Sequence, residues 1–174
     1  SNIANVHIIR GEYDIALNYL HESYSMISTF LSEKHPLNAH NNFLLGITYY
    51  RLGELEKSLK YSKRSLEMYE NNIDYKKKLL VIYQLADSYH ELGDNGMAFK
   101  YYQQALEIIT KSKGYSSVIA INIYVSLGLI YQDNGDIQNS NMYFNKALDI
   151  LMRMNDDLIS NNLLYFEIGS IYKY

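Results

Sequence analysis

Apolar residues recur along this chain at the spacing of a helix that buries one side. Leu85, Ala86 and Tyr89 are separated as i, i+1 and i+4, and segment 127–131 repeats the pattern. Side chains three and four residues apart lie on the same helical face, so each segment carries one buried stripe. The small residue in each stripe lets a neighbouring helix approach closely. The pattern predicts an all-helical protein.

The same pattern returns at regular intervals of about 40 residues. Four glycines each precede an acidic residue, at 11, 53, 93 and 135, so the intervals are 42, 40 and 42 residues. An aliphatic–small pair precedes each glycine, and a fifth pair follows at Ile168-Gly169. The repeated positions comprise the pairs beginning at Ile3, Leu45, Leu85 and Leu127, the aromatic residues His7, Tyr49, Tyr89, Tyr131 and Tyr172, and the small residues Ala16, Ser58, Ala98 and Ser140. An internal repeat therefore organises the chain.

Each repeat is typical of two antiparallel helices. The glycine suits the position just after a helix, where the backbone turns left-handed. The acidic residue after it suits the start of the next helix, where free N–H groups meet negative charge. Pro36 suits a first helical turn. The pattern predicts helices over 2–10, 12–30, 37–52, 54–71, 74–92, 94–112, 116–134, 136–154 and 158–173.

The order of these residues resembles the tetratricopeptide repeat. It is clearest from Leu85 to Leu106 and from Leu127 to Leu148, although the period of 40–42 exceeds the usual 34 and the closing proline is missing. Repeats of this longer type resemble those of kinesin light chains and of the peptide-pheromone receptors of Gram-positive bacteria. The resemblance implies a right-handed superhelix, an α-solenoid of about four helix hairpins and a terminal helix.

The whole chain, 1–174, is expected to form a single array that is a fragment of a longer protein. Its repeats are expected at 1–31, 36–72, 74–113, 116–155 and, as a partial unit, 158–174. The final helix is apolar on more than one side, which favours either more repeats or a homo-oligomer formed through terminal helices.

Composition and charge exclude several functions. The net charge of −3 disfavours general nucleic-acid binding, and no run of about 18 apolar residues predicts a membrane span. With no cysteine, nothing demands an oxidising compartment, so a cytoplasmic location is expected. Lys57, Lys60, Lys63 and Arg64 alternate with acidic residues, which indicates a solvated face rather than a nucleic-acid site.

Nothing in the sequence predicts catalysis, a metal site or a cofactor. The five histidines include no pair at i, i+4 and no HExxH motif, and no serine lies in a GxSxG motif. His7 occupies a repeated aromatic position, which favours a packed imidazole. Gly93-Asp94-Asn95-Gly96 matches the turn between two helices of a repeat rather than a phosphate loop.

The resemblance implies that the first helices of the repeats line a concave groove that binds an extended peptide or protein segment. Carried over by position, the groove residues are Asn5; Phe43, Ile47, Tyr50 and Arg51; Tyr83, Gln84, Asp87 and His90; Asn122, Ser126 and Leu129; and Phe166 and Glu167. The same positions also include His40, Leu44, Leu80 and Glu91. The acidic members favour a neutral or basic apolar peptide.

In family members that clamp the carboxylate of a chaperone tail, lysine, arginine and asparagine occupy some of these positions. Here the corresponding residues are Phe43, Ile47, Tyr83, Asp87, Leu80 and Gln84, so such a clamp is not expected. Three hypotheses follow: a non-catalytic peptide-binding scaffold, a peptide-sensing domain of a bacterial transcription regulator or phosphatase, and a structural module for oligomerisation.

Overall fold

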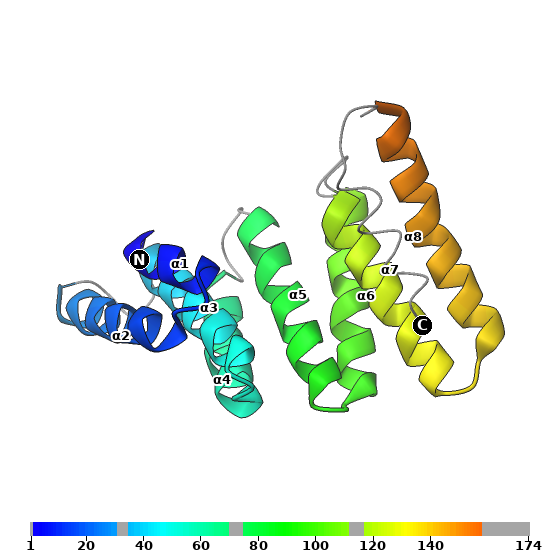
Figure 1. Cartoon of the computed structure of the whole chain (residues 1–174). Coiled ribbons are helices and arrows are strands. Elements are labelled where there is room, and N and C mark those ends of the chain that lie inside the picture. The colour runs from blue at the N-terminus through cyan, green and yellow to red at the C-terminus, as the bar shows by residue number, and fades with distance from the viewer. Residues whose placement is uncertain (1, 31–34, 70–74, 112–116, 158–174) are drawn as a thin grey trace. The chain divides into compact units, whose positions relative to one another are not determined.

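The computed structural model describes residues 2–30, 35–69, 75–111 and 117–157, and all of their regular structure is helical. The helices in these ranges are α1 (Asn2–Ile9), α2 (Tyr13–Phe30), α3 (Pro36–Arg51), α4 (Leu55–Tyr69), α5 (Tyr75–Glu91), α6 (Asn95–Lys111), α7 (Ser117–Asp133) and α8 (Ile137–Asp157), labelled in Figure 1. Eight of the nine expected helices are thus confirmed to within a few residues, and α8 runs three residues further than expected. The ninth, at 158–173, lies outside the described residues.

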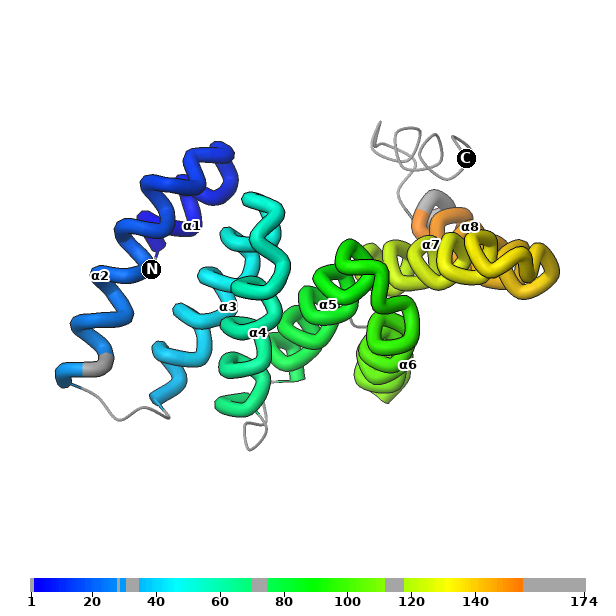
Figure 2. Tube along the Cα trace, turned by 90° about the horizontal axis from the view of Figure 1, so that it is seen from below, coloured from blue at the N-terminus to red at the C-terminus, as the bar shows by residue number. Residues whose placement is uncertain are grey.

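Consecutive helices pack as hairpins. Packing divides the chain into an N-terminal unit, Ser1–Tyr101, and a C-terminal unit, Tyr102–Tyr174, with the boundary inside α6. In the N-terminal unit α1 packs on α2 and α3 on α4, and α2–α3 and α4–α5 contacts join successive hairpins. In the C-terminal unit α7 packs on α8. Figure 2 shows α3 beside α4 and α7 beside α8.

The repeated glycines end the first helix of each hairpin, as the sequence predicts. Their φ angles lie between 75° and 82°, a left-handed conformation that only glycine adopts without strain. At the second turn the Gly53 N–H donates to the Tyr50 carbonyl and the Glu54 N–H to the Tyr49 carbonyl, both at 2.9 Å. These two bonds satisfy carbonyls that the helix end leaves without partners. The hairpin direction is therefore set by local backbone chemistry.

The acidic residue after the glycine begins the next helix. The Asp94 carboxylate accepts the Met97 N–H at 3.0 Å, and the Asp136 carboxylate accepts the Asn139 N–H at 3.1 Å. The Asn139 side-chain amide also donates to Asp136 at 2.7 Å, and this bond, with the backbone N–H of Asn139, lowers the pKa of Asp136 because both stabilise its charged form. Pro36 is the first residue of α3, as expected, and the His35 ring accepts the Leu37 N–H at 3.2 Å.

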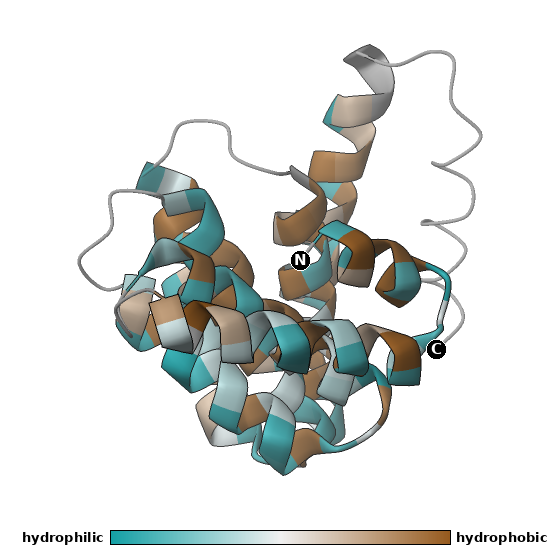
Figure 3. Cartoon of the chain, turned by 90° about the vertical axis from the view of Figure 1, so that its left-hand side faces the viewer, coloured by the Kyte–Doolittle hydropathy of each residue, from teal (hydrophilic) through white to brown (hydrophobic). Residues whose placement is uncertain are grey.

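Helices come together closely at the small residues of the stripe. A Cβ atom placed on Gly128 would lie 2.5 Å from the ring of Phe144, and one on Gly46 would lie 2.3 Å from the Ser62 hydroxyl. Hydrophobic and hydrophilic residues alternate along the helices, as the colours in Figure 3 show. The aliphatic residues Leu45, Leu85 and Leu127 are fully buried. The apolar stripe that predicts the helices is thus also their packing surface.

The middle of the N-terminal unit contains more buried polar side chains than an apolar stripe predicts. Asn38, Asn41, Asn42, Thr48, Ser58, Ser62, Ser65 and Ser88 are each 1% exposed or less. Hydrogen bonds join the helices there: Asn41 donates to the Leu20 carbonyl, Ser65 to the Ala39 carbonyl, and the Ser58 and Ser88 hydroxyls lie 2.9 Å apart. We call these residues the polar seam.

Candidate functional site

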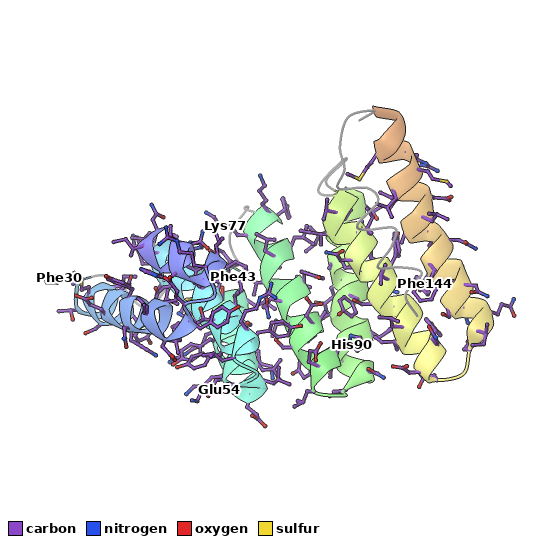
Figure 4. The ribbon with its side chains drawn as sticks, in the orientation of Figure 1. Phe30, Phe43, Glu54, Lys77, His90 and Phe144 are labelled. Carbon is purple, nitrogen blue, oxygen red and sulfur yellow. The ribbon has the colours of Figure 1, made fainter. Side chains whose placement is uncertain are left out.

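The first helices α3 and α5 expose a continuous mixed surface in the N-terminal unit. Its members recur every three or four residues, which places them on one side of each helix. They are His40, Phe43, Ile47, Tyr50 and Arg51 of α3, and Lys77, Leu80, Tyr83, Asp87, His90 and Glu91 of α5, all half-buried or exposed. We call this surface the α3–α5 face. Figure 4 labels Phe43 on α3 and Lys77 and His90 near the two ends of α5.

Tyr50 joins the two helices at one end of the face. Burial, together with the negative charges of Asp87 and Glu91, raises the pKa of its phenol to about 12. The phenol also donates a hydrogen bond to the Glu91 carboxylate, while the nearby Arg51 acts in the opposite direction. Tyr50 and Asp87 are 37 residues apart in the sequence, and both are predicted groove residues. The structure brings them together.

His40 and Lys77 occupy the opposite end of the face. Burial lowers the pKa of the His40 imidazole, and the positive charge of Lys77 lowers it further. The ring centroids of His40 and Phe43 lie 6.4 Å apart. Aromatic surface and a positive charge therefore adjoin each other here, where α5 begins.

Apolar side chains fill the middle of the face. Phe43 packs against a buried cluster that includes Leu44 and Tyr49, and its outer part remains accessible. Leu44 itself is only 3% exposed, so the position that the repeat pattern assigns to the groove belongs to the core. Gln84 occupies the equivalent position in α5, is 8% exposed and donates to the Ser88 hydroxyl at 3.3 Å. We therefore place Gln84 beneath the face rather than on it.

The remaining predicted residues lie elsewhere. Asn5 is exposed on α1. Asn122 is exposed on α7, with Ser126 and Leu129 half-buried on the same helix in the C-terminal unit. Phe166 and Glu167, like the final helix expected to carry an oligomer contact, lie outside the described residues.

A repeated aromatic pair closes each hairpin, and sequence reasoning found only one half of it. Ring centroids lie 5.4–5.6 Å apart and the rings are nearly parallel, at interplanar angles of 7–14°. The pairs are His7–Tyr19, Tyr49–Tyr61, Tyr89–Tyr101 and Tyr131–Tyr143. The missed signal was a second aromatic register, always twelve residues after the first. His7 is stacked in this way, as a packed imidazole would be, and also bonds to Glu12.

Lysines of the expected solvated face lie over these aromatic rings. The ammonium of Lys57 is 5.1 Å from the Tyr49 ring centroid, and that of Lys63 is 5.2 Å from the Tyr89 centroid. A hydrogen bond to Tyr89 raises the pKa of Lys63. Lys57 also pairs with Glu54. The basic residues of α4 thus make contacts within the protein.

Two further surveys cover only the parts of the chain that the structure describes. No three histidine, cysteine, aspartate or glutamate side chains there form a group that could hold a metal ion. No helix among these residues has the length and apolar character needed to cross a membrane.

The fold and the repeated positions define a class of protein. The family model described as "Tetratricopeptide repeat" matches residues 1–71 and 78–153. The chain therefore belongs to the tetratricopeptide repeat family, as its repeated positions predict.

The curated relatives are distant, and their names describe functions that differ from one another. The chain is 24% identical over 163 residues to response regulator aspartate phosphatase E of Bacillus subtilis, covering 93% of this chain and 42% of the phosphatase. It is 25% identical over 138 residues to photosystem I assembly protein Ycf3 of Prochlorococcus marinus, covering 76% of this chain and 78% of that protein. The chain thus spans less than half the length of the phosphatase that it matches.

Solved structures share the fold. BtubC (BKLC) from P. vanneervenii superposes with a TM-score of 0.75 at 22% identity, covering 98% of this chain and 69% of that chain. A putative kinesin light chain from Podosopora anserina superposes with a TM-score of 0.70 at 17% identity, covering 88% and 73%. These similarities confirm a fold of sequential helix hairpins and the resemblance to kinesin light chain repeats.

Proposed function

We propose that this protein is a non-catalytic scaffold whose α3–α5 face binds a peptide segment of a partner. Tetratricopeptide repeat domains generally bind protein segments, and the observation that supports the site is the meeting of Tyr50 with Asp87 and Glu91. These groups come from two different repeats and lie on a surface that is partly open to solvent.

The chemistry of the face suits an extended peptide. Phe43, Ile47 and Tyr83 offer apolar and aromatic surface for side chains, while carboxylate and hydroxyl groups offer hydrogen bonds to the peptide backbone. Asp87 and Glu91 favour a neutral or basic apolar segment. Asn122, Ser126 and Leu129 of α7 are proposed to form a binding surface of the C-terminal unit in its own right.

Selection from a random peptide library displayed on phage, with the whole chain as bait, tests this function. We expect Tyr83→Ala and Asp87→Ala each to weaken binding of the selected peptides by about tenfold, the loss expected for a contact of about 1.4 kcal/mol. Phe30→Ala and Glu56→Ala are matched controls, because both residues are exposed on other helices. Unchanged affinity in both face variants, with circular dichroism showing a native fold, would refute the site.

A second candidate is the peptide-sensing domain of a bacterial regulator or phosphatase. The match to response regulator aspartate phosphatase E supports it, because it covers nearly all of this chain. In this role the peptide bound by the α3–α5 face would control a module elsewhere in a longer protein.

The gene that encodes this sequence distinguishes the two candidates. A helix-turn-helix of about 60 residues encoded before Ser1 supports a transcription regulator, whereas further repeats support a simple scaffold. For a phosphatase, the full-length product is expected to accelerate loss of the acyl phosphate from a phosphorylated response regulator. The selected peptide is expected to change that rate, and no effect of protein or peptide would exclude this role.

A further inference from the structure

The two ends of the α3–α5 face carry opposite charge. Lys77, in the first turns of α5 between Lys76 and Lys78, lies close enough to His40 to lower its pKa. At the other end Asp87 and Glu91 lie near Tyr50, where the charge of Arg51 acts in the opposite direction on the Tyr50 pKa. Half-buried Phe43, Ile47 and Tyr83 separate these ends.

The residue pairs at both ends share one register, so the charges lie along the line where α3 and α5 meet. His40 is 37 residues before Lys77, and Tyr50 is 37 residues before Asp87 and 41 before Glu91. The offset of 37 at both ends, together with the packing of α3 on α5, means that the two helices run side by side in the same direction, as alternate helices of stacked hairpins do. The same offset sets Phe43 level with Leu80.

We propose that the α3–α5 face binds short peptides in one direction, with a cationic group beside Asp87 and Glu91 and an anionic group beside Lys77. This inference rests on the proposed peptide-binding function and adds the chemistry and orientation of the ligand. A peptide with free termini carries its positive amine at one end and its negative carboxylate at the other. The α3–α5 face thus favours a peptide whose N-terminus, with an added lysine or arginine, lies at Tyr50. The C-terminus of that peptide, with an added glutamate or aspartate, then lies at Lys77.

The distance between the two charged ends of the α3–α5 face sets the length of the peptide used to test the proposal. Ten residues of helix separate His40 from Tyr50, which is about 15 Å at 1.5 Å per residue. An extended chain covers that distance with about four or five residues. A pentapeptide therefore reaches both charged ends at once.

Two pools of uncapped pentapeptides with the same composition test the proposal. One has the form Lys-X-X-X-Glu and the other Glu-X-X-X-Lys, where X is leucine, phenylalanine, tyrosine, valine or asparagine. Affinity selection with the whole chain, read by mass spectrometry without labels, ranks both pools. Equal net charge removes any general attraction to the acidic protein. We expect the Lys-first pool to bind about three- to tenfold more tightly, as two partly exposed ion pairs would give.

Reversing the charges on the protein makes the test decisive. The double variant Lys77→Glu with Asp87→Lys is expected to prefer the Glu-first pool. Glu107→Lys with Lys111→Glu, which reverses an exposed ion pair on α6, is expected to keep the wild-type ranking. Lys77→Gln alone is expected to reduce the preference, which keeps the test valid if the double variant does not fold.

The possible outcomes separate this inference from the function on which it rests. Equal binding of the two pools, or an unchanged ranking in a folded double variant, overturns the orientation and leaves peptide binding intact. If neither pool binds, the inference is also overturned. The proposed function falls as well only if peptides selected on phage are insensitive to Tyr83→Ala and Asp87→Ala.

Discussion

At the scale of single residues, the shape of each hairpin depends on positions where one extra carbon atom has no room. Gly128 of α7 faces the Phe144 ring of α8, which Figure 4 labels, and the ring would meet an added Cβ at 2.5–2.9 Å. An aromatic ring that is half-buried cannot move away as a flexible side chain does. The two helices would have to separate.

We therefore expect Gly128→Ala to lower the free energy of unfolding by about 1–3 kcal/mol, as overpacking of a closed interface does. Gly96→Ala is the matched control. Gly96 lies in the first turn of α6, where an added Cβ would meet only an Asp94 oxygen at 3.6 Å. It is expected to raise the free energy of unfolding by about 0.5–1 kcal/mol. Urea unfolding followed by circular dichroism measures both, and equal effects would contradict the packing argument.

Tyr50 gives a second residue-scale prediction, on pH dependence. Its pKa rises from 10.0 to about 12 because burial and the Asp87 and Glu91 carboxylates disfavour the phenolate. The folded chain holds this proton more tightly than the unfolded chain. Tyr50 therefore stabilises the fold fully below pH 10 and loses that contribution as the pH rises toward about 12.

The difference in absorbance at 295 nm between the wild type and Tyr50→Phe, followed against pH, reports this phenol alone. We expect it to titrate near pH 12, and at lower pH in Asp87→Asn, because one of the opposing charges is then gone. Titration at an unshifted pH in the folded wild type would contradict the contact between α3 and α5.

At the scale of elements, the aromatic pairs set how the two helices of a hairpin face each other. Stacked rings contribute about 0.5–1.5 kcal/mol beyond the area that they bury. A double-mutant cycle with Tyr49→Leu and Tyr61→Leu is expected to show a coupling energy in this range. The cycle with Tyr49→Leu and Tyr101→Leu is the control, because Tyr101 stacks on Tyr89 instead. Urea unfolding measures both cycles, and equal coupling energies would show that stacking is not the cause.

The elements themselves were predictable from the sequence, because their signals are local. Glycine after a helix, an acid before the next and apolar residues at helical spacing all act within a few residues. The second aromatic register was equally visible in the sequence but acts only between helices. The polar seam was not predictable, because an asparagine in a helix such as Asn41 looks solvent-exposed until the carbonyl of Leu20 is placed beside it.

At the scale of the whole molecule, repeat proteins owe their stability to contacts between neighbouring elements. Leu127 of α7 is fully buried within the C-terminal unit. We expect Leu127→Ala to lower the stability of that unit by about 2–5 kcal/mol. Hydrogen exchange read by mass spectrometry is expected to speed up in α7 and α8 and to stay unchanged in α1, α2 and α3.

Leu85→Ala is the reciprocal control, because Leu85 is fully buried in the N-terminal unit. Its effect on hydrogen exchange is expected in α3, α4 and α5. Faster exchange throughout the chain in both variants would show that the two units unfold together, against this prediction.

The candidate site was predictable in part, because the position of a residue within its repeat is also a local signal. Position within a repeat predicts Tyr50, Tyr83 and Asp87 as groove residues, and all three are half-buried. It did not distinguish the face from the layer beneath it, where Leu44 and Gln84 lie. That difference depends on the angle between neighbouring helices, which no single repeat encodes.

The polar seam makes the hairpins of the N-terminal unit unequal, although their period is nearly the same. A hydroxyl such as Ser58 meets its counterpart Ser88 only when α4 is followed by α5. In α7 the position equivalent to Ser88 is Ile130. Exchanging the α5–α6 hairpin for α7–α8 would therefore place an isoleucine opposite the Ser58 hydroxyl and remove its hydrogen-bond partner. The buried polar groups of each hairpin thus match those of its own neighbours. Shuffled arrays built from this chain should assemble only in the native order.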